Sequence, residues 1–162
     1  MKRIIQVGLA ATSLVFGASL LHPFGPVKQE RLDVASFTSA GAPPEITHLV
    51  ERACQNCHSE RTEWPWYSYV APMSWMIEND VSSARTHMNL SHWQDYTVEK
   101  RIDLLTRIAV EVRNRKMPLP KYVKVHSEAR LSTEEVQQLY SWAHSERKRL
   151  KTADTKGKYS TD

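Results

Sequence analysis

The chain is poor in glycine and cysteine, and both shortages restrict what it can do. Only five of 162 residues are glycine, and neither GxGxxG nor GxxxxGK followed by Ser or Thr occurs, which excludes the common glycine-rich phosphate loops. Two cysteines, three positions apart, cannot cross-link a small disulfide-rich domain. A net charge of +4 is too small to predict a nucleic-acid-binding protein. With 41% apolar and 25% charged residues, the chain is not wholly disordered.

The first 27 residues have the composition of an export signal. Lys2 and Arg3 precede a segment, 4–27, that contains no Lys, Arg, Asp or Glu and is mostly apolar up to residue 21. This layout predicts a signal peptide cleaved after Gly17-Ala18-Ser19 or an uncleaved anchor, because 18 apolar residues just reach the length of a membrane span. We therefore expect a periplasmic protein, held at the inner membrane by this segment if it is not removed.

Apolar spacing after the export segment predicts one helical domain. Residues 28–42 have no steady period and predict a linker, 43–150 form the domain, and 151–162 form a polar, frayed tail. Apolar residues recur at helical spacing, and two Ser/Gln or Ser/Glu pairs have the form of capping boxes. We find no strand-like alternation, so the predicted fold class is all-α. The expected helices are 43–53, 72–88, a short one opening at Ser91, 97–116, and a last one opening at Ser132.

The decisive motif is Cys54-Gln55-Asn56-Cys57-His58. Cys-x-x-Cys-His is the attachment signature of c-type haem. Two thiols three residues apart on one helical turn reach the two vinyl groups of a single haem, and the following histidine supplies the proximal ligand of the iron.

Three other interpretations of the cysteine pair stay open. A redox-active dithiol would need a βαβ context that the sequence lacks. A structural zinc site would need two histidines besides Cys54 and Cys57, although no second CxxC and no HxxxH pair is present. The third is a plain disulfide.

The sixth iron ligand has several candidates. Met117 lies between a predicted helix end and two prolines that stiffen its loop, and it is the predicted distal ligand. Met73, Met76 and Met88 fall on a predicted helix and are interpreted as core packing. A second histidine is the alternative, from His87, His92 or His126, and an open, five-coordinate iron is the remaining one.

Aromatic and basic residues near the motif predict further contacts. Trp66, in a Trp-Pro-Trp-Tyr run six residues after His58, is expected to cover the ring or hold a propionate. Arg85 is expected either to bind a propionate or to lie on a solvated helix face. Segment 113–124 holds five cations and no acidic residue, so an acidic redox partner is expected to dock there.

From about Glu45 to Trp142 the chain resembles a small bacterial family, the haem-binding domains of cytochrome c type. The shared features are Cys54-x-x-Cys57-His58-Ser59, Thr62-x-Trp64-Pro65-Trp66-Tyr67-Ser68, Ala71-Pro72-x-Ser74-Trp75, Ala84-Arg85, Asn89-Leu90-Ser91-x-Trp93, Met117-Pro118-Leu119-x-x-Tyr122, His126, Leu131-Ser132-x-x-Glu135 and Trp142. Ala84 stands where the family commonly has glycine.

The resemblance implies a class I cytochrome c-like fold around one covalently bound haem c. It implies that Cys54 and Cys57 attach the haem, that His58 is the proximal ligand and that Met117 is the distal one. The expected function is to carry single electrons without turning over a substrate, and the alternative is a haem sensor or a peroxidase-like enzyme with a displaceable sixth ligand.

Overall fold

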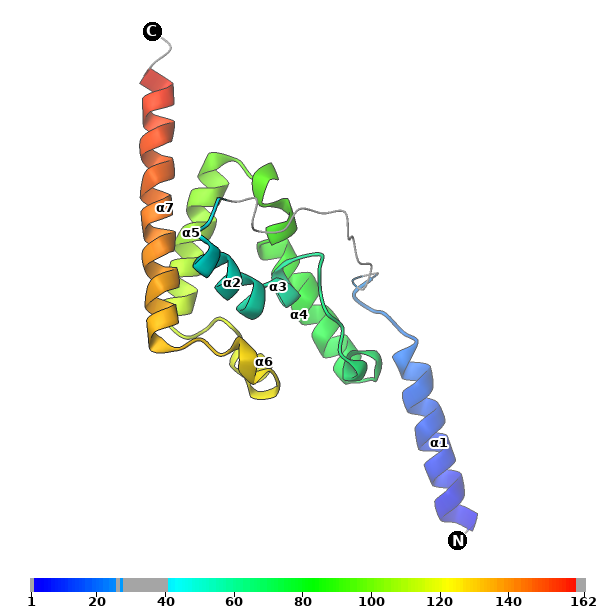
Figure 1. Cartoon of the computed structure of the whole chain (residues 1–162). Helices are drawn as coiled ribbons and strands as arrows, with labels where there is room; N and C mark the ends of the chain where they lie inside the picture. Colours follow the sequence, from blue (N-terminus) through cyan, green and yellow to red (C-terminus); the bar gives the residue numbers. More distant parts are fainter. Residues whose placement is uncertain (1, 26, 28–40, 160–162) are drawn as a thin grey trace.

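The computed structural model describes residues 2–25, 27 and 41–159, and the chain is helical throughout this part, with no strand (Figure 1). This confirms the all-α prediction. The elements, of which those marked η are 3-10 helices, are α1 Lys2–Ser19, α2 Pro44–Ala53, α3 Gln55–His58, η2 Trp66–Tyr69, α4 Met73–His87, η3 Leu90–Asp95, α5 Val98–Arg113, α6 Pro120–Val125, η4 Ser127–Ala129 and α7 Thr133–Tyr159.

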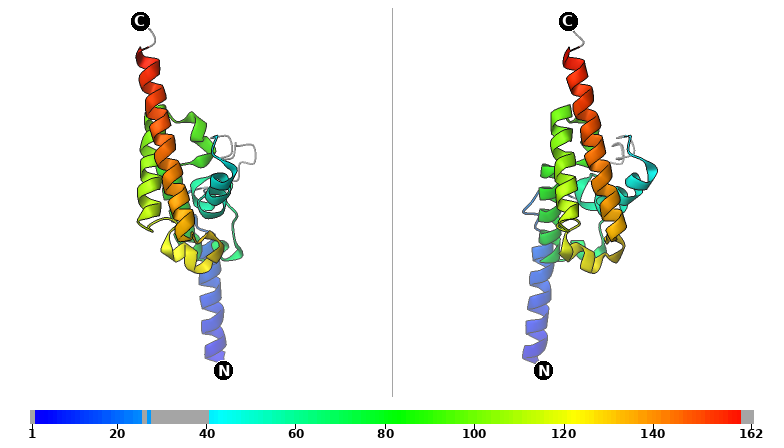
Figure 2. Two further views of the ribbon diagram at one scale, coloured as in Figure 1. Left: turned by 60° about the vertical axis from the view of Figure 1, so that its left-hand side comes forward. Right: turned by 90° about the vertical axis from the view of Figure 1, so that its left-hand side faces the viewer.

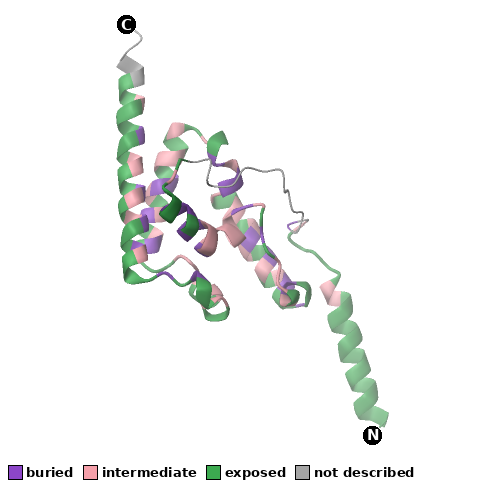
Figure 3. Cartoon of the chain, in the orientation of Figure 1, coloured by how far each residue is buried: buried purple, intermediate pink, exposed green. Residues whose placement is uncertain are grey.

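Helix α1 projects away from the other helices, and none of its side chains is buried (Figure 3). Among the described residues, no helix is both long and apolar enough to cross a membrane. The anchor expected at the N-terminus stays a prediction. Most of the predicted linker, residues 28–40, lies outside the described residues.

One apolar core holds α2, η3, α5 and α7 together. Helices α5 and α7 lie side by side in every view (Figure 2), and Leu104 and Leu105 of α5 face Leu139 and Ala143 of α7 within the core cluster. Each of these side chains is at most 2% exposed. The apolar residues whose spacing predicted these helices form the face that each helix buries.

The helix boundaries confirm one predicted capping box and correct the other. Ser132 and Glu135 bond reciprocally, the amide of each to the side chain of the other, at 2.8 and 3.2 Å. Ser91 does not begin the short helix as predicted, because Asn89 takes the cap position and accepts a bond from the Ser91 amide at 3.1 Å.

Two stretches are more helical than the sequence predicts. Pro120, one of the two prolines expected to stiffen a loop, opens α6, at a position where a missing amide hydrogen costs nothing. The residues expected to fray after Leu150 continue α7 as far as Tyr159.

The end of α1 and the segment that follows it pack on α4 and on the chain just before α4. The Ala71 amide donates to Ser19 Oγ at 2.9 Å, and Trp75 Nε1 donates to the Leu21 carbonyl at 3.0 Å. His22 Nδ1 lies 3.0 Å from a carboxylate oxygen of Glu78, whose side chain is almost wholly buried. Residues that the sequence analysis placed in the export segment thus contact the helical domain.

The α5–α7 core predicts a large cost for truncating Leu105. Leu105 is 0% exposed, so Leu105→Ala leaves a cavity and is expected to lower the free energy of unfolding by roughly 2–5 kcal/mol. Urea unfolding followed by circular dichroism measures it. Val110→Ala on the same helix is the control, because Val110 is 47% exposed and should cost well under about 1 kcal/mol. Equal losses in the two variants would contradict the proposed core.

Candidate functional site

Helix α3 brings the motif residues together. Helix α2 ends at Ala53, and the chain turns at Cys54 into α3, where the Cys57 and His58 amides both donate to the Cys54 carbonyl, at 3.2 and 3.0 Å. Both cysteines are free thiols. The two sulfur atoms and the imidazole therefore belong to one tight helical turn.

The imidazole of His58 is prepared to bind a metal through Nε2. Its Nδ1 lies 3.0 Å from the Met88 carbonyl oxygen, which can only accept, so Nδ1 carries the hydrogen and Nε2 keeps a lone pair. Burial lowers the pKa of His58, so the ring is neutral at pH 7. A histidine that binds a metal usually donates its other N–H to a carbonyl or carboxylate in this way.

The two thiols are protonated in this structure. Burial raises the pKa of Cys54 to about 12, with the neighbouring Cys57 adding to the effect. Burial, and next Asp80, raises the pKa of Cys57 to about 11, while Arg85 and Lys121 oppose the shift. With pKa values this high, neither cysteine is a thiolate at pH 7, which argues against a reactive dithiol.

A large hollow opens beside Cys57. Its volume is about 800 Å³, including space open to solvent, and its walls are mainly apolar. Helix α4 supplies Met73, Met76 and Ile77, and α6 with the residue after it supplies Tyr122 and His126. Size and lining are those of a site for a small organic ligand or cofactor.

The donor set and the hollow fit a haem better than a bare metal ion. No group of three or more His, Cys, Asp or Glu that could hold a metal occurs among the described residues, so the zinc hypothesis lacks ligands there. Two thiols and a neutral imidazole lie on one turn, and Cys57 of that turn lines an apolar hollow, a combination that suits a haem.

Comparison with known proteins agrees. A family model described as haem-binding domain matches residues 15–145. The chain belongs to the haem-binding domain family. No curated protein and no solved structure matches it. The match begins inside α1, which is consistent with the contacts that Ser19, Leu21 and His22 make with the rest of this haem-binding domain.

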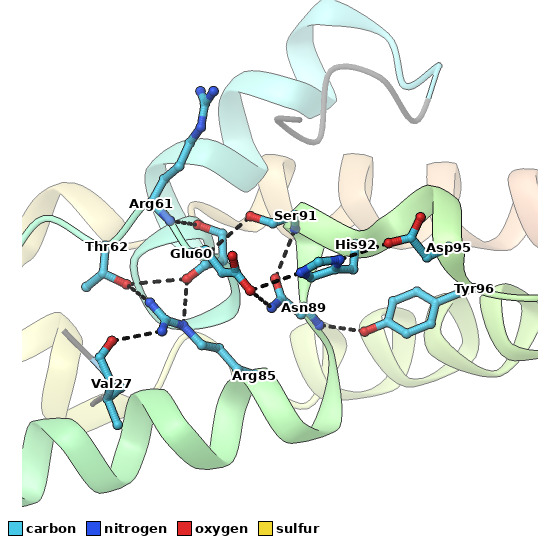
Figure 4. A network of polar contacts seen from close by, with 11 residues as sticks. Val27, Glu60, Arg61, Thr62, Arg85, Asn89, Ser91, His92, Asp95 and Tyr96 are labelled. Atoms are coloured by element: carbon cyan, nitrogen blue, oxygen red, sulfur yellow. Dashed lines mark hydrogen bonds and ion pairs between the residues drawn. The ribbon is translucent and has the colours of Figure 1, made fainter. Parts of the chain in front are cut away.

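The structure gives Arg85 a different use from the one expected. Its guanidinium donates to the Ser59 carbonyl at 2.8 Å, the Val27 carbonyl at 2.9 Å and Thr62 Oγ1 at 3.0 Å (Figure 4). It lies neither on a solvated face nor in the hollow. Arg85 instead fixes the loop after His58 to α4, and a bond to a propionate stays a prediction.

Trp66 points away from the hollow. Its side chain is 78% exposed, whereas its neighbours Trp64, Pro65 and Tyr67 line the hollow. Trp66 makes an edge-to-face contact with Tyr67, with ring centroids 5.8 Å apart. The aromatic run thus does reach the site, but through the residues on either side of the one predicted.

Met117 lies apart from Cys57. It lines a second hollow of about 580 Å³, together with Arg115, Leu131 and Val136, and the residues lining the two hollows do not overlap. Helix α6 separates them, because Tyr122 and Val125 face the first hollow while Pro120 and Val123 face the second. The structure does not bring Met117 together with the motif, and its role as ligand stays a prediction.

The sequence analysis missed a hydrogen-bonded cluster on the wall of the first hollow. Tyr67 OH lies 2.5 Å from His126 Nε2, and His126 Nδ1 lies 2.8 Å from Glu128 Oε1. The ring of His126 stacks on Tyr122 at 4.3 Å. The i, i+4 spacing of Tyr122 and His126 is the one signal in the sequence, and it becomes readable only once 120–125 is known to be a helix.

A second polar network holds the loop after His58 against η3 (Figure 4). His92 bridges two carboxylates, with Nε2 2.9 Å from Glu60 and Nδ1 2.8 Å from Asp95. These two bonds, that to Asp95 first, raise the pKa of His92. The Glu60 amide donates to Ser91 Oγ at 3.0 Å.

Replacing Arg85 should loosen the loop that follows the motif. Arg85→Met removes three hydrogen bonds from a half-buried cation and leaves their acceptors to water, so we expect a loss of roughly 2–3 kcal/mol in the free energy of unfolding. Chemical denaturation measures it. Arg107→Met is the control, because Arg107 is exposed and bonds only Asp103 on its own helix. A loss no larger than that of the control would contradict the role given to Arg85.

The stability of the protein should depend on pH through His92. The pKa of His92 is raised in the folded state, so His92 stabilises the fold. Its contribution to the free energy of unfolding is complete below its unfolded pKa of about 6.5 and is lost as the pH rises through its folded pKa. Wild-type protein is therefore expected to lose free energy of unfolding from about pH 6.5 upward. His92→Gln should flatten this fall, whereas His87→Gln, at an exposed histidine of α4, should not. Parallel profiles for all three proteins would rule out this contribution.

Proposed function

We propose that this haem-binding domain carries one haem c, attached by thioether bonds to Cys54 and Cys57 with His58 as proximal ligand, and that it transfers single electrons outside the cytoplasm. The observation that carries the proposal is the CxxCH turn: free thiols on both sides of the turn, and a neutral imidazole whose Nδ1–H is already bonded to the Met88 carbonyl. A haem bound there would supply one-electron chemistry.

The residues around the motif support an electron carrier. The Met88 carbonyl fixes the ring orientation and basicity of His58, and the apolar wall of α4 excludes water from one side of the hollow, both of which set a reduction potential. A site with both axial positions filled leaves no place for a substrate, so we expect no enzymatic turnover.

Export and docking complete the proposal. The charge-free stretch at 4–27 after Lys2 and Arg3 supports export, and thus a periplasmic location. Lys121 lines the hollow, Lys124 lines the second hollow on the other face of α6, and Lys116 is exposed just before this helix. An acidic redox partner is therefore expected to dock over α6. Lys121 is already paired with Asp80 at 2.7 Å, which weakens its share of that attraction.

Covalent attachment is the first property to test. Protein expressed with a c-haem maturation system should show the mass of the chain plus one haem after denaturation, and a c-type spectrum when reduced. Cys54→Ser and Cys57→Ser should each leave one thioether, and the double variant should lose its haem on acid extraction, because the chain has no other cysteine. Haem that can be extracted from the wild-type protein would contradict covalent attachment. Rapid peroxide turnover would favour an enzyme instead.

A further inference from the structure

His126 is the histidine among the described residues that line the hollow, whereas His58 reaches it only through its neighbour Cys57. The position of His126 is set from several sides. It directly follows α6 and lines the same hollow as Cys57, and its side chain is 22% exposed. Its ring stacks on Tyr122, with an angle of 20° between the rings. The hydroxyl of Tyr122 accepts a bond at 3.1 Å from Asn56, a residue inside the CxxCH motif. The motif and His126 are thus linked through one tyrosine.

The hydrogen bonds of His126 repeat those of His58. Nδ1 faces a carboxylate oxygen of Glu128 at 2.8 Å, and since an ionised carboxylate only accepts, Nδ1 carries the hydrogen. Nε2 lies 2.5 Å from the Tyr67 hydroxyl. Both histidines have an Nδ1–H bonded to an oxygen, the arrangement common to histidines that bind a metal through Nε2. In His126 a metal would take the place of the Tyr67 hydroxyl at Nε2.

Glu128 is itself held in place. Arg52, in the last turn of α2, donates to the Glu128 carbonyl, to the Arg130 carbonyl at 3.2 Å and to a carboxylate oxygen of Glu135 at 2.5 Å. The short helix η4 that carries Glu128 is therefore fixed to the helix leading into the motif. These bonds fix the backbone of Glu128, from which its carboxylate, 62% exposed, reaches His126 Nδ1.

The methionines are less suitable. Met117 is on the far side of α6, in the hollow next to Leu131 and Val136. Met73 and Met76 do line the hollow of Cys57, but their flexible side chains are 41% and 48% exposed, whereas His126 is held by a stack and two hydrogen bonds. An axial ligand gains from such restraint because less side-chain entropy is lost on binding.

From this we infer that His126, rather than Met117, is the sixth ligand of the haem, with Glu128 as the positioning residue behind it. The inference rests on the proposed function, because it needs a haem with His58 on its other side. The iron would then have two histidine ligands instead of the expected histidine and methionine. Its reduction potential should be lower than that of a His/Met site, because a methionine ligand raises the potential of cytochromes c.

The test is spectroscopic. Four proteins are matured with haem: the wild type, Met117→Leu, His126→Gln and His87→Gln. The last is the control, at an exposed histidine. Mass spectrometry first confirms covalent haem in each. We expect the ferric wild-type protein to lack the weak far-red band of methionine-ligated haem, and the reduced protein to resist carbon monoxide at low concentration. Met117→Leu and His87→Gln should match the wild type in spectrum and potential. His126→Gln should open the sixth position and bind carbon monoxide at once.

Two results would overturn the assignment of His126. One is a far-red band in the wild-type protein, whichever methionine causes it, and this result is decisive even where His126→Gln fails to fold. The other is a haem-loaded His126→Gln variant that keeps the wild-type spectrum and potential. Protein without haem would instead refute the proposed function, and the ligand assignment would fall with it.

Discussion

The hydrogen bond between His58 Nδ1 and the Met88 carbonyl is the interaction on which the site depends. It joins α3 to the residue where α4 ends, so the motif and the main wall of the hollow are fixed to each other. It also determines which nitrogen of the ring keeps a lone pair. Arg85, one turn before the end of α4, adds bonds to the Ser59 carbonyl and Thr62 just beyond the motif. Helix α4 thus orients the proximal ligand and positions the loop that follows it.

Two parts of the molecule are stabilised in different ways. Where α2, η3, α5 and α7 meet, the core is apolar, and it includes Leu104, Leu105 and Leu139. Around the hollow the buried side chains of the described residues are mostly polar: η2 buries Ser68, α4 buries Ser74 and Glu78 besides Val81, and α3 and α6 bury none. Hydrogen bonds and ion pairs replace apolar packing there. Such a region gains its missing apolar contact from whatever fills the hollow.

The sequence predicted what depends on spacing along the chain. Apolar residues three and four apart located α2, α4, α5 and α7, and the pair Ser132 and Glu135 located the start of α7. The CxxCH turn was equally readable. The partners of Arg85 could not be predicted from the sequence. Val27, for example, is 58 positions away, and neither an arginine nor a valine indicates that the other is its partner. Helix α6 has only six residues, too few for a periodic pattern, so its two faces could not be assigned, and the sequence could not show that Met117 and Cys57 line different hollows.

The position of α6 also shows that a Met-Pro pair need not lie at the hollow beside Cys57. Proline stiffens a loop, but stiffness helps a ligand only if the loop points its sulfur toward the metal. Here the helix that starts at Pro120 turns Tyr122 and His126 toward Cys57, and it leaves Met117 beside Val136 of α7. A short helix with one aromatic face selects which residue reaches the site. That residue, His126, is an imidazole whose Nδ1 is bonded to the carboxylate of Glu128 two positions later.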